Sequence, residues 1–401
     1  MKNPGYLVLA DGTIFNGTIS GELAKISGEV VFSTAMTGYA EILSDPSFFG
    51  QIVVLANPEI GNYGVNLNDI QSCGVKVRAL VVKKLSSRAS SFRSHMTLSD
   101  WLMREKIPII EGIDTRALIA HIREKGAMIG IVTHKKDSCL EALVEEVKNL
   151  PPMANTRLSP MVSVKTATHV AENLLSIDDQ PIKGSDKKFK VVVLDFGIKK
   201  ELIRYLEHVG CSIILLPSDA RIEEIWAHQP DGIFLSNGPG DPHTETIAVN
   251  TVRALLAKIP IFGVCMGHQV LAQALGMQTY KLKFGHRGSN QSVKLSDGSV
   301  IMTAQNHGFA VKVGEAPSYS DINLSDGSNE GIDRPNYFAF SVQFHPEGAP
   351  GPKDALNSFT KFTRYMEQWK KKTLSDSCPS AKNNVSFRDC EFVEDRDQSR
   401  A

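Results

Sequence analysis

The sequence predicts an α/β protein in which a C-terminal domain has a mostly parallel sheet with helices on both faces, preceded by a separate N-terminal mixed α/β domain. From Phe189 onward, strand-like runs alternate with helical patterns, which is typical of a parallel sheet. A polar segment ending at Lys188 precedes this alternation and has the composition of a linker. The 401 residues are more than one ordinary domain holds.

We therefore divide the chain into three parts. Residues 1–185 form the N-terminal domain with its linker, and residues 189–372 form the C-terminal domain. Residues 373–401 are polar and charged with almost no apolar side chains, so we expect them to form a disordered tail.

The N-terminal domain is expected to begin with a hairpin, because two strand-like runs flank Asp11-Gly12. Strands at 29–35, 52–56 and 75–83 follow it, and then a capped helix that begins at Thr97. The segment from Ile107 is expected to lead from a further strand into a second capped helix at Asp114. The second helix is expected to run to about Glu124 and to stop at Gly126. No glycine-rich nucleotide-binding loop is visible in this domain.

The C-terminal domain is predicted to contain strands at 189–195, 212–216 and 232–236. Helices are predicted at 199–209 and, near the end of the domain, at 358–370. A strand at 300–304 is expected to lead into a loop at 306–310. In such a sheet, functional groups lie beyond the carboxyl ends of the strands. Loops that follow these strands are therefore the first candidates for a site.

The segment from Pro260 to Gly276 reads as a short buried strand, a sharp turn at Cys265 and a helix. Glycines two residues before and two residues after the cysteine make a Gly-x-Cys-x-Gly elbow. They are needed because a side chain on so tight a turn leaves no room for flanking Cβ atoms. The elbow indicates a reactive cysteine, although a lone cysteine is often an inert core residue.

The chemistry expected of Cys265 follows from its place in the first turn of a helix. The helix dipole favours the thiolate, which is the nucleophilic form. The N–H groups beside the thiol have no intrahelical acceptor, so they can hold a developing oxyanion.

A second candidate lies at the end of a β-prone run, in Phe344-His-Pro-Glu347. Side chains two apart on an extended chain point the same way, so His345 and Glu347 can share a side. A histidine can take the thiol proton while a carboxylate orients the imidazole. These residues predict a triad of Cys265, His345 and Glu347; His286 and His307 are weaker alternatives for the base.

Gly263-Val-Cys-Met-Gly-His-Gln269, together with Phe344-His-Pro-Glu347, resembles the class I (triad) glutamine amidotransferases. Such enzymes hydrolyse the side-chain amide of glutamine through a glutamyl thioester and pass ammonia to a synthase. The resemblance implies that the Met266 amide serves the oxyanion, although the family often has leucine there. It also implies a glutamine site formed by Gly238, Gly240, Gln269, Asn306, Gly308 and Phe309.

The N-terminal half carries a resemblance of its own. Met36-Thr-Gly-Tyr39, Leu43-Ser-Asp-Pro-Ser47, Pro58-Glu-Ile-Gly-Asn-Tyr-Gly64 and Gly112-Ile-Asp-Thr-Arg116 are similar to the amino-terminal domain of the carbamoyl phosphate synthase small-subunit family. In that family the serine at the Ser47 position reaches the glutamine. The resemblance covers most of the first 150 or so residues and selects one synthase among those that use triad amidotransferases.

This second resemblance implies a large synthetase subunit as partner, in a heterodimer or a higher oligomer built from it. No cofactor is expected in this chain; ATP and Mg²⁺ are expected on the large subunit. The product would be carbamoyl phosphate, used in pyrimidine and arginine synthesis. Three alternatives stay open: service to another synthase, a free-standing thiol hydrolase, or a non-catalytic scaffold for the large subunit.

Composition restricts the other partners. Lys+Arg and Asp+Glu both number 44, so no excess charge favours nucleic acid or an anionic membrane. No signal peptide and no apolar run of about 20 residues is visible. The six cysteines and eleven histidines show no metal-ligand spacing, so we expect no metal and a reducing, cytoplasmic location.

Overall fold

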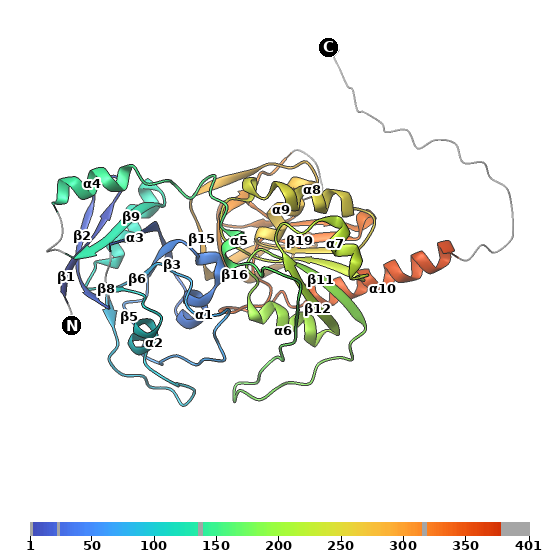
Figure 1. Ribbon diagram of the computed structural model, residues 1–401, viewed down its shortest axis with the longest axis horizontal. Coiled ribbons are helices and arrows are strands. Elements are labelled where there is room, and N and C mark those ends of the chain that lie inside the picture. The colour runs from blue at the N-terminus through green and yellow to red at the C-terminus, as the bar shows by residue number, and fades with distance from the viewer. Residues whose placement is uncertain (1–2, 22–24, 135–138, 315–318, 378–401) are drawn as a thin grey trace, which may run out of the picture.

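The computed structural model describes residues 3–21, 25–134, 139–314 and 319–377. Two large sheets organise these residues: a closed barrel formed by the first third of the chain and a ten-stranded sheet formed by the rest. Figure 1 shows the barrel on one side and the ten-stranded sheet with its helices on the other. The predicted α/β class is confirmed, while the closure of the N-terminal strands into a barrel was not predicted.

Seven strands close the barrel in the order β1-β2-β8-β6-β4-β3-β9. They are β1 (Asn3–Leu9), β2 (Ile14–Ser20), β3 (Ile26–Ser33), β4 (Gln51–Leu55), β6 (Ala79–Val82), β8 (Ile109–Glu111) and β9 (Met128–His134). All seven contribute to one apolar cluster, through Leu7, Ile19, Val30, Ile52, Val81, Ile110 and Val132 among others. Side chains from every strand of a closed barrel meet in its interior, which is therefore a packed core.

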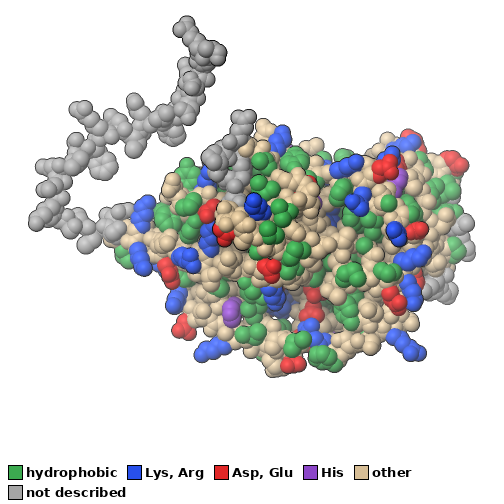
Figure 2. Space-filling view, turned by 180° about the vertical axis from the view of Figure 1, so that it is seen from behind, with side chains coloured by type: hydrophobic (Ala, Val, Ile, Leu, Met, Phe, Trp, Pro, Cys, Tyr) green, Lys and Arg blue, Asp and Glu red, His purple; other side chains and the backbone are tan. Residues whose placement is uncertain are grey.

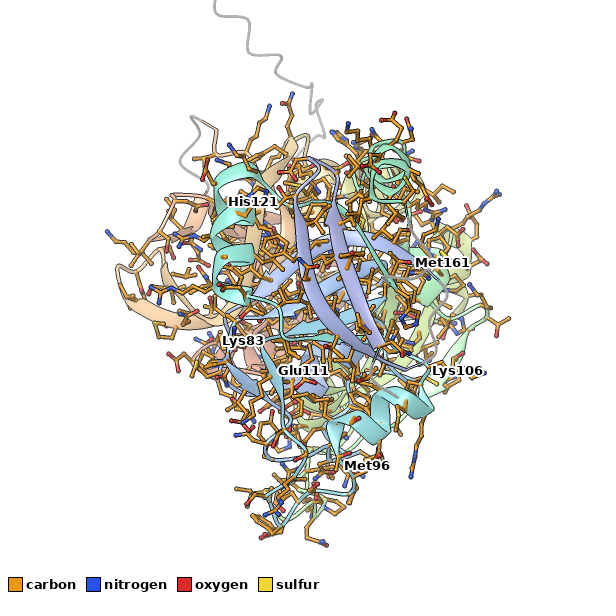
Figure 3. The ribbon with its side chains drawn as sticks, turned by 90° about the vertical axis from the view of Figure 1, so that its left-hand side faces the viewer. Lys83, Met96, Lys106, Glu111, His121 and Met161 are labelled. Carbon is orange, nitrogen blue, oxygen red and sulfur yellow. The ribbon has the colours of Figure 1, made fainter. Side chains whose placement is uncertain are left out.

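Four helices pack on the barrel: α1 (Tyr39–Ser44), α2 (Leu98–Arg104), α3 (Thr115–Lys125) and α4 (Leu140–Lys148). The predicted hairpin is confirmed, since β1 and β2 pair antiparallel. The predicted cap of α3 is also confirmed, because Ala117 N donates to Asp114 Oδ1 at 3.0 Å. Figure 3 looks onto this end of the molecule, where His121 on α3 lies with its Nε2 2.6 Å from Asp11 Oδ2.

The ten-stranded sheet has a parallel centre in the order β12-β11-β13-β14-β19. These strands are β11 (Phe189–Asp195), β12 (Cys211–Pro217), β13 (Gly232–Leu235), β14 (Ile261–Val264) and β19 (Ala339–Val342). The helices that connect or follow them are α6 (Lys200–His208), α7 (Ile222–Ala227), α8 (Thr246–Leu255), α9 (Met266–Ala274) and α10 (Asn357–Ser377).

The side chains of β11 show why helices lie on both faces. Val191 and Val193 point to one face, where they join Leu202 of α6 and Phe359 of α10 in an apolar cluster. Val192 and Leu194 point to the other face, into a cluster with residues of α7, α8 and α9. Because successive residues of a strand face opposite sides, a strand apolar at every position needs a cover on each.

Antiparallel strands extend the sheet beyond β19, in the order β18 (Asn329–Arg334), β17 (Tyr319–Asn323), β15 (Thr279–Lys294) and β16 (Val300–Val311). The prediction of a loop at 306–310 was wrong, because these residues continue β16 and pair with β15. The pairing partner lies about twenty residues upstream, so the local sequence could not reveal it, and Asn306-His-Gly308 has the composition of a loop.

Strand β15 also joins the two halves of the molecule. The rings of Phe284 on β15 and Phe32 on β3 stack with centroids 6.0 Å apart. Ala127 N donates to Lys283 O at 2.8 Å, and Thr34 N donates to Arg287 O at 3.2 Å. The barrel is therefore attached to the ten-stranded sheet through β15, a strand of its antiparallel extension.

Three further observations concern the predicted divisions of the chain. β10 (Thr168–Val170), which precedes the predicted linker, pairs with β12 and so belongs to the second sheet. Helix α10 extends to Ser377, beyond the predicted end at 370 and into the segment from 373 that we expected to be disordered. The rest of the predicted tail, 378–401, lies outside the described residues.

The surface mixes both signs of charge. In Figure 2, Lys and Arg side chains alternate with Asp and Glu across the visible face, without a field of one sign. Among the helices of the described ranges, none combines the length and the apolar character needed to cross a membrane.

Candidate active site

Cys265 stands between β14 and α9 with φ 54° and ψ −102°, a backbone conformation that non-glycine residues rarely adopt. A Cβ on Gly267 would lie 2.1 Å from Leu235 O, and one on Gly263 would lie 2.6 Å from Gly267 O. Gly267 is therefore required by the packing of the turn against β13, and Gly263 by the close approach of α9 to its own strand. This is the strained elbow that the sequence predicts, and it holds the thiol at the carboxyl end of the parallel strands.

His345 and Glu347 follow the end of β19. His345 N donates to Ala304 O of β16 at 2.8 Å, which fixes the backbone position of the histidine. Its Nδ1 donates to Glu347 Oε1 at 2.9 Å, so Nε2 is the ring nitrogen left to exchange a proton. Cys265, His345 and Glu347 are all buried. The structure thus brings the predicted triad together.

The electrostatics of the triad favour a charged imidazole. Burial lowers the pKa of His345, but the charge of Glu347 outweighs it, so the pKa is raised above its usual value. For Glu347 burial raises the pKa, but the nearby Lys199 and His345 together lower it well below its usual value. The carboxylate is therefore ionised, and it stabilises an imidazolium at His345.

Cys265 is close enough to His345 to add to the rise in that pKa. In this structure the thiol nevertheless points to Asn306 O, 3.6 Å from Sγ, and His345 Nε2 has no hydrogen-bond partner among the described residues. A change in the orientation of the thiol is therefore enough to pair it with Nε2. Such loose contacts before substrate binds are common in active sites.

Lys199 is a site residue that the sequence analysis missed. It precedes α6, its side chain is buried, and Nζ donates to Glu347 Oε1 at 2.6 Å and to Ala349 O. Burial lowers the pKa of Lys199, but Glu347 and Asp45 outweigh it, and the pKa is raised. One carboxylate oxygen thus serves both Lys199 and His345. Lys199 could have been identified from its position just after the carboxyl end of β11, because functional groups were expected at that edge of the sheet.

A pocket opens beside Cys265. Every residue predicted to bind glutamine lies on its wall: Ser47, Gly238, Gly240, Met266, Gln269, Asn306, Gly308 and Phe309. His345 lines a second cavity, together with Lys199 and Ala349. Asn306 lies on the walls of both cavities. The individual roles of the wall residues stay predictions.

The pocket is built from both halves of the molecule. Ser47 comes from a 3-10 turn after α1, and its Oγ accepts from Asn237 Nδ2 at 2.9 Å. Its neighbour Asp45 accepts from Asn306 Nδ2 at 3.1 Å. The N-terminal segment is thus tied by side-chain hydrogen bonds to the loop after β13 and to β16. Asp45 and Asn237 were not predicted, because neither belongs to a local pattern with a chemical meaning.

Two further contacts shape the wall. Gln269 Nε2 donates to Phe309 O at 2.8 Å, so the α9 side chain holds the β16 backbone in place. A Cβ on Gly238 would lie 2.3 Å from Phe196 O, and Gly240 has φ +98°. The loop after β13 therefore needs both glycines to approach the pocket closely.

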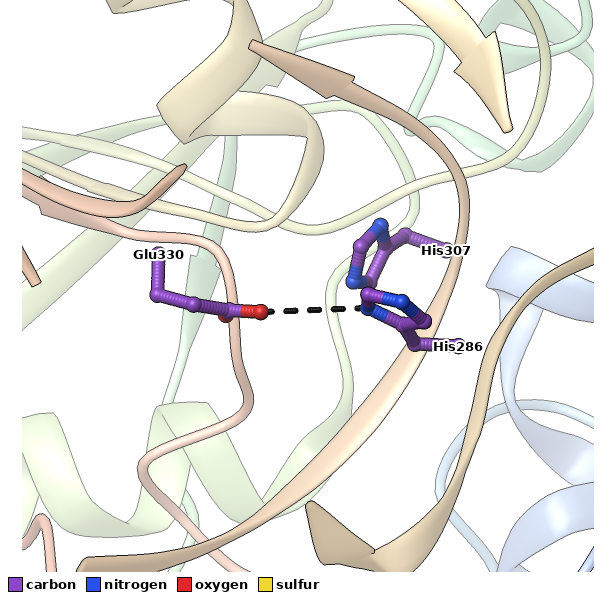
Figure 4. Close-up of side chains that lie close together, drawn as sticks. All are labelled: His286, His307 and Glu330. Carbon is purple, nitrogen blue, oxygen red and sulfur yellow. Dashed lines mark ion pairs between the residues drawn. The ribbon is translucent and has the colours of Figure 1, made fainter. Parts of the chain in front are cut away.

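His286 and His307, the weaker candidates for the base, belong to a buried polar cluster with Glu330 (Figure 4). His307 Nδ1 donates to Phe309 O at 2.8 Å, and its Nε2 lies 3.0 Å from Gln305 Oε1. Burial, with the nearby His286, lowers the pKa of His307 well below its usual value. Because both ring nitrogens are engaged, neither histidine is placed to receive the Cys265 proton.

The same three residues are, within the described ranges, the group whose ligand-type atoms approach one another within 4.8 Å. The Gln305 amide already lies between the two rings, 3.1 Å from His286 Nδ1. We therefore interpret the cluster as a hydrogen-bonded network, and the expectation of no metal stays a prediction.

Two family models match this chain. The model described as carbamoyl-phosphate synthase small chain, CPSase domain, matches residues 7–132, and the model of class-I glutamine amidotransferases matches residues 192–365. The first match covers the barrel, and the second covers the parallel sheet with Cys265, His345 and Glu347.

Curated relatives match over nearly the whole chain. The carbamoyl phosphate synthase small chain of Syntrophotalea carbinolica is 44% identical over 367 residues, covering 90% of this chain and 97% of the relative. That of Nostoc sp. (strain PCC 7120) is 44% identical over 383 residues, covering 93% and 98%. A solved glutamine amidotransferase from Thermotoga maritima is 20% identical, with a TM-score of 0.33, over 47% of this chain and 84% of that one.

Proposed function

The chain belongs to the family of carbamoyl phosphate synthase small chains, and we propose that it hydrolyses glutamine at Cys265 and delivers the ammonia to a large synthetase subunit. The observation that carries the proposal is the geometry at Cys265. A strained thiol at a helix start lies on the wall of a pocket and close to a histidine–glutamate pair.

In the first half of the reaction, the Cys265 thiolate adds to the side-chain carbonyl carbon of glutamine. The negative charge that forms on the oxygen is held by the Met266 N–H and by an amide of the Gly238–Gly240 loop. His345 then donates its Nε2 proton to the departing nitrogen, which leaves as ammonia, and a glutamyl thioester remains on Cys265.

In the second half, neutral His345 takes a proton from a water molecule, which adds to the thioester carbonyl. The C–S bond breaks, glutamate leaves, and the thiolate–imidazolium pair is restored. Glu347 stays ionised throughout and orients the imidazole through Nδ1. These steps balance with water and protein groups alone, so we assign no cofactor to this chain.

The ammonia must then meet bicarbonate activated by ATP, and we place those steps, with ATP and Mg²⁺, on the large subunit. The product is carbamoyl phosphate, a precursor for pyrimidine and arginine synthesis. The smallest assembly that performs the whole reaction is a heterodimer. We place it in the cytoplasm; the free thiols of Cys73, Cys139, Cys211 and Cys265 support a reducing compartment.

The test compares glutamine and ammonia as nitrogen sources for the chain reconstituted with a carbamoyl phosphate synthase large subunit, ATP and bicarbonate. We expect Cys265→Ser to abolish glutamine-dependent synthesis and to leave ammonia-dependent synthesis intact. Cys73→Ser, which changes an exposed thiol, is the matched control and should retain both activities.

Two results would contradict the proposal, and a third would invalidate the comparison. Full glutamine hydrolysis without the partner, and indifferent to its addition, would indicate a free-standing hydrolase. Glutamine-dependent synthesis that survives Cys265→Ser would indicate a scaffold. Loss of ammonia-dependent synthesis in the same variant would show that the substitution disrupts the assembly and not only the triad.

A further inference from the structure

Arg287 is a buried arginine without a carboxylate of its own. It lies on β15, opposite Asn306 in the ladder with β16, and only 5% of its surface is exposed. Among the described residues its side chain makes one hydrogen bond, from Nη1 to Phe284 O at 2.6 Å, and Nε has no acceptor. A guanidinium carries five donors, and burying one without an anion is unfavourable unless a ligand completes it.

The guanidinium lies on the wall of the pocket that Cys265 opens into. Two glycines make room for it: a Cβ on Gly285 would lie 2.4 Å from Nη1, and one on Gly308 would lie 3.2 Å from Nη2. Gly308 is itself on the pocket wall. With no side chain at Gly308, the Nη2 end of Arg287 packs against Gly308 on the pocket wall.

Burial lowers the pKa of Arg287, and the charges of Glu29 and Cys265 oppose that effect. Glu29 does not neutralise the guanidinium, because both of its oxygens are used elsewhere. Oε1 accepts from Lys281 Nζ at 2.5 Å and Oε2 from Gln51 Nε2 at 2.8 Å. Glu29 and Lys281 neutralise each other, and the pocket keeps the positive charge of Arg287.

We infer that Arg287 is a specificity residue that recognises the α-carboxylate of the substrate amino acid. The inference rests on the proposed function, because it assumes that the side-chain amide of glutamine reaches Cys265. With that amide at the thiol, the α-carboxylate is the anionic group of the substrate left to meet the guanidinium on the pocket wall. The pocket then admits amino acids with a free carboxylate and disfavours neutral or peptide-linked amides.

The experiment uses the full chain with its large subunit and compares two substrates, L-glutamine and L-glutamine α-amide, in which the carboxylate is replaced by a neutral amide. Ammonia release gives kcat/KM for each. We expect Arg287→Met to lower the ratio of the two kcat/KM values by about 10- to 100-fold, mainly through the KM for glutamine. Ammonia-dependent synthesis should not change.

The matched control is Arg204→Met. Arg204 on α6 is equally buried, but it is paired with Glu201 at 3.1 Å and with Glu172 at 3.7 Å. This variant should keep the wild-type ratio. Should Arg287→Met fail to assemble, as judged by ammonia-dependent synthesis, Arg287→Gln provides the same comparison with a neutral side chain able to donate to Phe284 O.

Equal loss toward both substrates would assign Arg287 a structural role and overturn the inference while leaving the proposed function intact. A wild-type complex that hydrolyses neither amide would overturn both. A lower ratio in Arg287→Met and an unchanged one in Arg204→Met would establish recognition of the carboxylate.

Discussion

Glu347 binds two partners through one oxygen. Its Oε1 lies 2.9 Å from His345 Nδ1 and 2.6 Å from Lys199 Nζ, and all three side chains are buried. The buried Glu347 carboxylate is compensated by these two partners. Its replacement by a neutral side chain would leave their positive charge buried without a carboxylate. The pH dependence of stability should therefore report directly on this pair of contacts.

The sign of that dependence follows from the two pKa shifts. The raised pKa of His345 gives a stabilisation that is complete below its usual value of 6.5 and is lost as pH rises through about 10. The lowered pKa of Glu347 gives a second stabilisation, which is complete above pH 4.5, the usual pKa of the group, and is lost as pH falls toward about 2. Both contributions are complete together between pH 4.5 and 6.5.

We predict that the stability difference between wild type and Glu347→Gln is largest in that window and shrinks as pH rises toward 10. In the variant, burial and the charge of Lys199 both lower the pKa of His345 and the carboxylate no longer opposes them, so acidification below 6.5 should destabilise the variant. Denaturant midpoints of both proteins across this pH range provide the measurement. Parallel curves would show that the triad does not titrate as a coupled unit.

The residues of the triad were predictable because each stands in a short pattern with a chemical meaning: an elbow around Cys265, and a histidine two residues before a glutamate. Lys199, Asp45 and Arg287 were not, because their importance arises from contacts between distant segments. Asp45 and Asn306, for example, are separated by 261 positions along the chain. No local pattern records such a contact.

At the scale of elements, the elbow depends on the close approach of α9 to β13. Gly267 N donates to Ser236 O at 2.9 Å, and the space for a Cβ at this position is occupied by Leu235 O. A side chain here must push the helix away from the strand, and the helix carries both the nucleophile and the oxyanion amide.

We predict that Gly267→Ala reduces glutamine-dependent synthesis by at least about 100-fold and lowers the free energy of unfolding by about 1–3 kcal/mol, the usual cost of overpacking. Gly276→Ala, at the other end of α9, is the control. A Cβ there meets nothing within 4 Å, and only its φ of +85° is unfavourable. It should lose about 1–2 kcal/mol with little change in activity. Comparable activity in the two variants would refute the packing argument.

The elements themselves were predictable to different degrees. Strand-helix alternation from Phe189 gave the parallel centre, because each strand is apolar throughout and each helix has its own cap or periodicity. The antiparallel extension was not foreseen, because β15 and β16 are long, polar at many positions and interrupted by glycines. Their pairing is decided by the partner strand and by the barrel that β15 touches.

At the scale of the whole molecule, the barrel completes a pocket that the sheet alone leaves open. Asp45 is the tie: it accepts from Ser47 N at 2.8 Å, from Asn306 Nδ2 at 3.1 Å and from Asn237 Nδ2 at 3.4 Å. One buried carboxylate thus orders the Ser47 turn and two pocket-lining segments of the C-terminal half. This arrangement was beyond prediction, since the closure of the barrel and its docking onto β15 had to be known first.

Removal of the Asp45 carboxylate should break the hydrogen bonds between the barrel side and the C-terminal half without unfolding either. We predict that Asp45→Ala raises the KM for glutamine by at least about 10-fold, because Ser47 and Asn306 lose the carboxylate that both contact. Ammonia-dependent synthesis should be kept.

Asp114→Ala is the matched control: it removes an aspartate that caps α3 within the barrel. That variant should lose about 1 kcal/mol of stability and keep its KM. Steady-state kinetics and denaturant unfolding of both variants separate the two effects. If Asp45→Ala lost stability and kept its KM, the aspartate would be a cap like Asp114, and the barrel would have no part in shaping the pocket.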